Sequence, residues 1–135
     1  MTDATWDETD LAQIGRHDEV RISSLRPDGM LTGGRIIWAV RLDGRVYVRS
    51  VNGPTAAWYR STRHRHAGQL TAGRLVKDVT MLDLDDTATA TATATDGIQE
   101  RIDAAYRAKY HGYPGPVARI TADQARATTL ELAPR

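Results

Sequence analysis

Basic and aromatic side chains gather in the middle of the chain, in an order suited to an anionic ligand with a flat ring. Between Asp43 and Asp78 there is no acidic residue, and the segment Arg45–Lys77 carries seven arginines or lysines and two histidines. Guanidinium groups match phosphate oxygens, and aromatic rings offer a stacking face. The residues that we expect to bind such a ligand are Arg49, Ser50, Gly53, Trp58, Tyr59, Arg60 and Arg63.

The expected backbone around these residues supports the same interpretation. A strand delivers Arg49 and Ser50 to its end, and Gly53-Pro54 then opens a short helix. The free N–H groups and the dipole at a helix N-terminus favour an anion. A phosphorylated flavin has the required phosphate and flat ring. The alternative is a solvated basic face, in which Trp58 packs into the core and the arginines meet only water.

Two other groups of side chains have types that could do chemistry. Tyr106 and Lys109 fall on adjacent faces of one expected helix and could act as an acid pair in catalysis. The alternative is aromatic packing beside a lysine whose stem covers apolar surface. His64 and His66 have an i, i+2 spacing that can chelate a metal on a strand. Because no carboxylate or third histidine is near them in the sequence, we expect no metal site.

Composition limits the class of protein. The chain has 135 residues, 41% hydrophobic and 26% charged, which suits a single globular domain over residues 1–135. It has no cysteine, which excludes disulfides and thiolate metal sites. A net charge of +1 argues against a nucleic-acid partner, although small barrels with aromatic residues among arginines can bind single strands.

The sequence also bears on location. No stretch approaches the roughly 20 apolar residues that a membrane span needs. The first residues are acidic and polar, whereas a secretory signal needs a basic start and an apolar run. We therefore expect a cytoplasmic protein with no membrane partner and a small-molecule ligand.

The elements that must position these residues form an α+β pattern. Helices are expected over residues 7–16, 55–62 and 97–110, and strands over 19–25, 35–42, 45–51, 67–72, 75–82 and 128–133. Asp43-Gly44 is a hairpin turn, and Asp96 with Gln99 can cap the long helix. The Thr-Ala repeat at 87–95 is expected to be a flexible connector. Strands without regular strand–helix alternation favour an α+β domain or a small barrel with short outer helices.

Several ordered pieces of the sequence resemble one family. These pieces are Arg21–Gly29, Ile37–Val40, Tyr47–Ser50, Gly53-Pro54, Trp58–Arg60, Lys77–Thr80, Asp103–Tyr110 and Ala127–Leu130. On them the chain resembles the domain-of-unknown-function family DUF2255, and the resemblance covers nearly the whole chain. That family is similar to the split-barrel flavin- and deazaflavin-binding proteins, the group around pyridoxamine phosphate oxidase and the deazaflavin-dependent nitroreductases.

The resemblance implies a fold and a function. It implies a split β-barrel of the FMN-binding type, a homodimer, and a ligand near the subunit interface. It also implies an oxidoreductase that uses FMN or a deazaflavin, whose cofactor carries out the hydride chemistry. The alternative is a relative without a cofactor that binds a small anionic or aromatic metabolite, as a binding protein or as a biosynthetic accessory enzyme that uses Tyr106 and Lys109.

Overall fold

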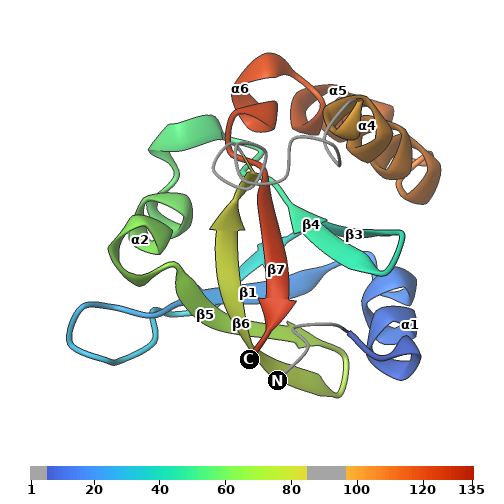
Figure 1. Cartoon of the computed structure of the whole chain (residues 1–135). Coiled ribbons are helices and arrows are strands. Elements are labelled where there is room, and N and C mark those ends of the chain that lie inside the picture. Colours follow the sequence, from blue (N-terminus) through green and yellow to red (C-terminus); the bar gives the residue numbers. More distant parts are fainter. Residues whose placement is uncertain (1–5, 85–96) are drawn as a thin grey trace.

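The structure is a computed structural model that describes residues 6–84 and 97–135, apart from the side chains of Arg63 and His64. The helices are α1 (Glu8–Arg16), the 3₁₀-helix η1 (Gly53–Thr55), α2 (Ala57–Arg65), α4 (Ile98–Lys109), α5 (Pro114–Ile120) and α6 (Asp123–Arg126). The strands are β1 (Val20–Ser24), β2 (Arg35–Ile37), β3 (Ala39–Leu42), β4 (Arg45–Val48), β5 (Ala67–Ala72), β6 (Leu75–Asp83) and β7 (Leu130–Pro134). The expected connector at 87–95 lies outside the described residues (Figure 1).

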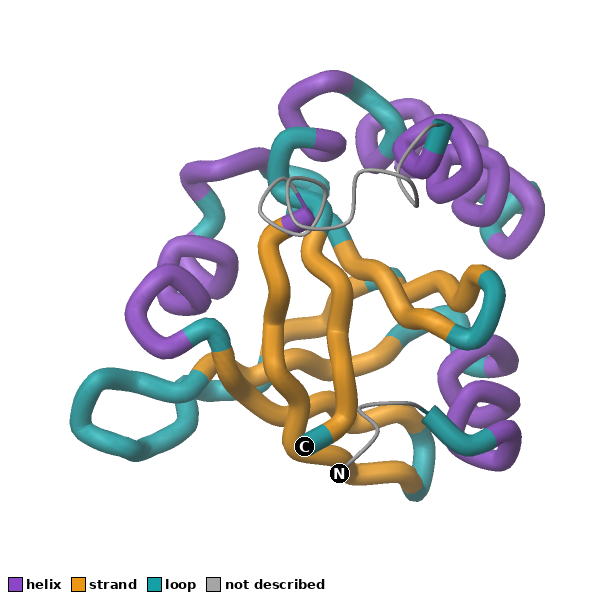
Figure 2. Tube along the Cα trace, in the orientation of Figure 1, coloured by secondary structure: helices purple, strands orange, loops and turns teal. Residues whose placement is uncertain are grey.

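The strands form one antiparallel sheet that curls into a nearly closed barrel. Their order is β2-β1-β5-β6-β7-β4-β3. The two strands at the ends of this order, β2 and β3, follow one another in the chain and are separated only by Trp38. The sheet must therefore curve until its two edges meet, and the strands wrap around a common interior in Figure 2. The expected α+β split barrel with short outer helices is confirmed.

Two apolar clusters lie on opposite faces of the β3–β4 hairpin. Ala39 and Val48 point into the barrel, whereas Val40 and Tyr47 point outward beneath α4. This division follows from the two-residue repeat of a strand. The barrel interior is filled by side chains from every strand and from α1, which include Ile14, Ile22, Val46, Leu70, Val79, Met81, Leu130 and Leu132.

Most expected elements are present, with three differences. The expected strand over 35–42 is two strands, because the chain changes its pairing partner at Trp38. The short helices α5 and α6 were not expected from the sequence. The N-terminus of α4 has Gly97 in the left-handed conformation as its cap, with no side-chain cap. The side chain of Gln99 instead accepts a hydrogen bond from Arg49, and Asp96 lies outside the described residues.

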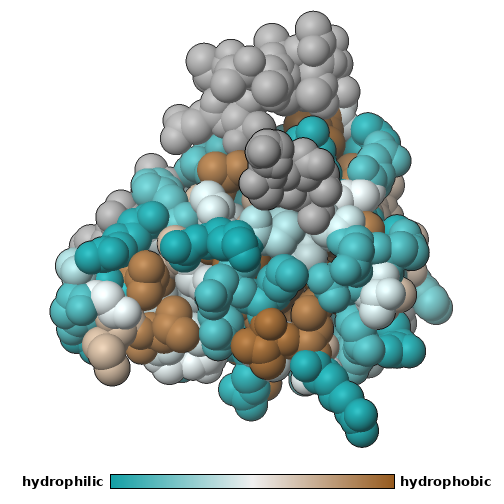
Figure 3. Space-filling view, turned by 60° about the horizontal axis from the view of Figure 1, so that its bottom comes forward, coloured by the Kyte–Doolittle hydropathy of each residue, from teal (hydrophilic) through white to brown (hydrophobic). Residues whose placement is uncertain are grey.

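Exposed large apolar residues are scattered. The face seen in Figure 3 carries its apolar residues in several small groups between polar ones. The most exposed of the large apolar side chains are Met30, Leu31, Ile36, Val76, Leu82 and Tyr113. Single residues of this kind are ordinary on a protein surface. Within the described residues, every helix is too short or too polar to span a lipid bilayer.

Candidate functional site

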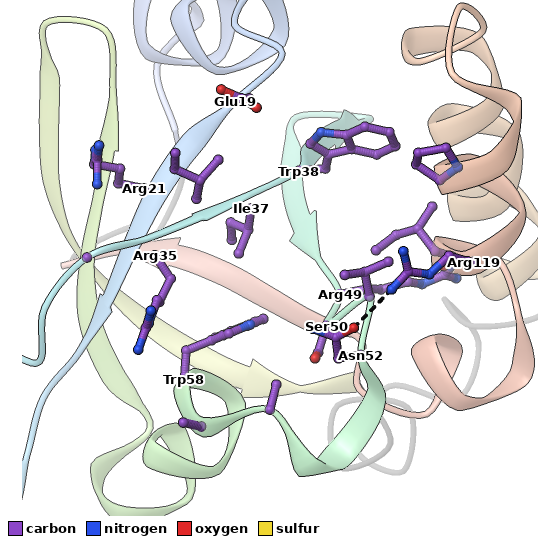
Figure 4. Close-up of a pocket in the computed structure, with 17 residues that line it drawn as sticks. Glu19, Arg21, Arg35, Ile37, Trp38, Arg49, Ser50, Asn52, Trp58 and Arg119 are labelled. Carbon is purple, nitrogen blue, oxygen red and sulfur yellow. Dashed lines mark hydrogen bonds between the residues drawn. The ribbon is translucent and has the colours of Figure 1, made fainter.

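A cleft opens where the β3–β4 ladder divides. That ladder pairs Ala39 with Val48, and the same register continued by two residues would pair Ile37 with Ser50. The chain instead turns at Trp38, and β2 pairs with β1. The two diverging segments, 34–38 and 49–52, line opposite sides of a cleft of about 680 Å³ (Figure 4). This is a usual size for a small-molecule site.

Arg49 anchors one side of the cleft from within the protein. Its guanidinium group donates from Nη1 to Asp103 Oδ1 (2.5 Å) and to the Ile120 carbonyl (3.1 Å). Nε donates to Thr129 Oγ1 (2.9 Å), and Nη2 donates to Gln99 Oε1 (2.6 Å) and to the Gln99 carbonyl (3.3 Å). These bonds use all five N–H groups of the guanidinium. Arg49 therefore ties β4 to α4, α5 and the start of β7, and has no free donor for a ligand.

Ser50, the residue after Arg49, is also buried, but among the described residues its side chain lacks the hydrogen bonds that the Arg49 side chain has. Its backbone N–H donates to Thr128 Oγ1 (2.8 Å), which fixes the strand end. Its side-chain hydroxyl is buried and has no hydrogen-bond partner within the described part of the chain. Leaving a buried hydroxyl unpaired costs about 1–3 kcal/mol. The hydroxyl lies just beneath the cleft wall that Ser50 lines, so a polar ligand atom can supply the missing partner once a neighbouring group shifts.

Two tryptophans line the cleft on opposite sides of Ile37 (Figure 4). The Trp38 ring stacks on Tyr110 with ring centroids 3.8 Å apart and planes 4° apart. Trp58 comes from α2 and meets Tyr59 edge to face at 6.1 Å. Both rings are held by aromatic neighbours, so they can offer fixed surfaces to a flat ligand ring.

The positive charge in the cleft wall comes mainly from outside the segment Arg45–Lys77. Besides Arg49, the lining arginines are Arg21 on β1, Arg35 on β2 and Arg119 on α5. Arg119 Nη2 donates to Asn52 Oδ1 at 3.0 Å, an interaction drawn in Figure 4. These three arginines were not expected at one site because they lie far apart in the chain, and Trp38 was not expected there because its pattern predicts the interior of a continuous strand.

Several basic residues of the segment Arg45–Lys77 are engaged elsewhere. Arg45 pairs with Glu131 (3.2 Å), Lys77 pairs with Asp10 (3.7 Å), and Arg65 donates to a backbone carbonyl. The segment as a whole therefore does not form one anion-binding surface.

The structure brings together only some of the expected ligand-binding residues. Ser50 and Trp58 line the cleft. Tyr59 is buried in the barrel core, and Arg60 is exposed on α2 and does not line the cleft. Gly53 has a positive φ of 79° in η1, where an added Cβ would lie 3.1 Å from the side chain of Gln124.

Arg63 lies on α2, but its side chain is outside the described part of the structure. Of the three arginines expected around Trp58, Arg49 is internal and Arg60 lies outside the cleft, so these two do not converge on a pocket.

Tyr106 and Lys109 make contacts that fasten α4 to the barrel. The Tyr106 hydroxyl donates to the Trp38 carbonyl (2.9 Å), and its burial raises its pKa. Lys109 Nζ donates to the carbonyls of Ile14 (3.0 Å) and Ala39 (2.6 Å). Burial lowers the pKa of Lys109 to about 8. Neither residue lines the cleft, and their contacts match the packing alternative.

The structure offers no support for a metal centre in the part of the chain that it describes. There, no group of three or more histidine, cysteine, aspartate or glutamate side chains lies close enough to hold a metal ion.

Comparison of the sequence with known families identifies its relatives. Residues 10–132 match the family described as "Uncharacterized protein conserved in bacteria (DUF2255)". The chain belongs to this family. The expected resemblance to DUF2255 is thereby confirmed. No curated protein matches the sequence.

Solved structures share the fold of this DUF2255 chain. The conserved hypothetical protein Rv2991 from Mycobacterium tuberculosis superposes with a TM-score of 0.57 and 11% identity, covering 98% of this chain and 82% of that one. A pyridoxamine 5'-phosphate oxidase-related, FMN-binding protein from Nostoc punctiforme gives a TM-score of 0.53 and 12% identity, with the same coverage. At these identities the likeness establishes the fold alone.

Proposed function

We propose that the cleft between β2 and the end of β4 binds a flavin- or deazaflavin-type cofactor, and that the protein is an oxidoreductase acting on a small molecule. The split-barrel fold, which an FMN-binding protein shares, supports this proposal. So does a cleft that combines two tryptophans, several arginines and a buried hydroxyl without a partner.

The residues of the cleft fit such a cofactor. Ser50, Asn52 and Arg119 would hold its phosphate or its hydroxylated chain, and Trp38 and Trp58 would contact the ring. When bound, the ring would supply hydride chemistry that no side chain of the cleft provides. Arg49 would act as a positioning residue, because its guanidinium holds the strand end that carries Ser50 and has no donor left.

The single observation that carries the proposal is the unpartnered Ser50 hydroxyl in the cleft. A hydroxyl that serves the fold alone normally has a partner, since burial without one is costly. In a ligand-binding protein that cost is recovered when the ligand binds. Removing the Ser50 hydroxyl should therefore leave the stability of the folded protein unchanged or raise it, but weaken ligand binding.

The test uses Ser50→Ala, with Ser61→Ala on α2, outside the cleft, as the matched control. We expect Ser50→Ala to leave the ligand-free protein as stable as the wild type or more stable, because it removes an unpaired polar atom. We expect the same variant to weaken FMN or deaza-FMN binding about tenfold, measured by fluorescence titration. Ser61→Ala should change neither the stability of the ligand-free protein nor its affinity for FMN or deaza-FMN. Riboflavin, which lacks the phosphate, shows whether the phosphate contributes.

The cofactor proposal fails if the wild type binds neither FMN nor deaza-FMN. In that case the second candidate stands: a relative without a cofactor that binds a small anionic or aromatic metabolite. Two observations favour this alternative: Arg49 is fully engaged inside the protein, and Arg60 lies outside the cleft. Thermal stabilisation by an anionic aromatic compound, without any flavin binding, would identify it.

We also propose that the chain forms a homodimer, as its similarity to split-barrel proteins implies. Ile36, on the edge strand β2 beside the cleft, is 53% exposed, and a second copy could cover it. Light scattering coupled to size-exclusion chromatography measures the mass directly. An Ile36→Glu variant should then elute as a monomer, whereas a monomeric wild type would refute the proposal.

A further inference from the structure

Two arginines in the cleft wall have no partner within the described residues. Arg21 and Arg35 both line the cleft and are exposed, and neither makes an ion pair or a side-chain hydrogen bond there. The other two lining arginines differ: Arg49 is fully paired inside the protein, and Arg119 donates to Asn52. The unpaired cations are therefore found on β1 and β2.

The cleft has two positively charged ends. In Figure 4, Arg21 and Arg35 lie toward one end, and Arg119 with Ser50 lies toward the other, with Ile37 between them. A single phosphate at the Ser50 end leaves the Arg21–Arg35 end without an anion. The carboxylate among the cleft-lining residues is Glu19, which forms no ion pair with either arginine. The two positive charges of the arginines exceed the single negative charge of Glu19, so this end of the cleft stays positive.

The surroundings of this end suit an anion attached to an apolar body. Arg35 pairs across the β1–β2 ladder with the buried Ile22 and lies on the same face of β2 as Ile37, with Trp58 on that side too (Figure 4). Arg21, in contrast, pairs across the ladder with the 53% exposed Ile36 on the opposite face. Charged groups at a cleft rim focus ligands of opposite charge.

The edge of β2 adds further donors and acceptors. This strand pairs with β1 alone among the described strands, so its other edge has no strand partner. Residues 34–38 all line the cleft, on both faces of the strand, which places this free edge along the cleft. Unpaired backbone groups on an edge can bond an incoming ligand.

We propose that Arg35 binds the anionic group, a carboxylate or a phosphate, of the small-molecule substrate, whose apolar part packs on Ile37 and Trp58, while Arg21 on the other face of the β1–β2 ladder adds to the positive field at this end of the cleft. This inference rests on the proposed function for the assignment of the Ser50 end to the cofactor. It deepens that function by naming the substrate class: a compact amphipathic anion. Neutral molecules of the same shape are poor ligands.

The test compares ligands of one shape and different charge. Benzoate and phenyl phosphate are the anionic probes, and benzamide is the uncharged analogue of benzoate. Binding is followed by tryptophan fluorescence, with and without saturating FMN. The variant Arg21→Gln/Arg35→Gln removes the charge, and Arg74→Gln in the exposed β5–β6 turn is the control.

We expect the wild type to bind benzoate or phenyl phosphate at least about tenfold more tightly than benzamide, as for a charge-assisted contact. The Arg21→Gln/Arg35→Gln variant should lose this preference, and Arg74→Gln should keep it. Comparing the dissociation constants of benzoate and phenyl phosphate shows which anion the site prefers. Equal binding of benzamide and both anions by the wild type would overturn the proposal, as would an unchanged anion preference in the double variant.

The two proposals fail in different ways. If the double variant loses FMN binding while Ser50→Ala retains it, the Arg21–Arg35 end of the cleft holds the cofactor phosphate, and the substrate assignment is overturned. If FMN does not bind but the charge preference persists and needs Arg21 and Arg35, only the cofactor proposal fails. If saturating FMN leaves the charge preference in place, both proposals are supported.

Discussion

Replacing Arg49 by Met should be among the most destabilising single changes in this protein. The side chain of Arg49 is fully buried, and that of Asp103 is 10% exposed. The substitution removes five hydrogen bonds and leaves the Asp103 carboxylate with Arg126 Nε, at 3.4 Å, as its other ion-pair partner. Removing one member of a buried ion pair costs about 3–5 kcal/mol, because the other charge stays buried.

This loss is large against the whole stability of a small domain, which is about 5–15 kcal/mol. The control is Arg26→Met, since Arg26 and Asp28 pair at 3.4 Å with both side chains more than half exposed. Exposed pairs of this kind contribute about 0–1 kcal/mol. Urea unfolding, followed by tryptophan fluorescence, gives the free energy of unfolding of each variant.

A double variant distinguishes the cost of losing the ion pair from the cost of leaving the Asp103 carboxylate buried without Arg49. Arg49→Met/Asp103→Leu removes both charges, so it should be more stable than Arg49→Met alone. A loss in the free energy of unfolding for Arg49→Met that is no larger than the loss for Arg26→Met would show that the buried ion pair is not critical for stability. Where Arg49→Met still folds, it should also weaken FMN binding, although the guanidinium has no donor for the ligand, because the strand end that carries Ser50 is released.

Two further predictions concern the barrel and its outer helix. Burial lowers the pKa of Lys109 from 10.5 to about 8, so from pH 8 upward the unfolded chain binds more protons there and stability should rise toward pH 10. Lys109→Met should flatten this rise in urea unfolding, and an unchanged slope would contradict the assignment. Gly68→Ala should cost about 3 kcal/mol, because its Cβ would lie 2.0 Å from the Ser23 carbonyl oxygen on the paired strand. The control is Gly112→Ala, because a Cβ at position 112 would have no neighbouring atom within 4 Å. Equal thermal midpoints for the two variants would show that the barrel can shift to accommodate a Cβ at position 68.

The sequence alone determined the local elements of this protein. Asp43-Gly44 adopts positive φ at both residues, which is the geometry that a two-residue hairpin needs. The apolar spacing of Ile98, Ile102 and Tyr106 gave the long helix, whose buried face carries these residues. Such patterns act over a few neighbouring residues, and they are therefore readable from a short window.

The cleft depends on contacts between distant parts of the chain. Whether Arg49 faces solvent or the interior depends on Asp103 and Gln99, about fifty residues later in the chain. The division at Trp38 depends on β1 competing with β4 for the same strand, a choice that alternation within the strand does not encode. The lining arginines come from β1, β2 and α5, which only the closure of the barrel brings together. Pairing and burial are long-range properties, so the local pattern could not predict which side chains line the cleft.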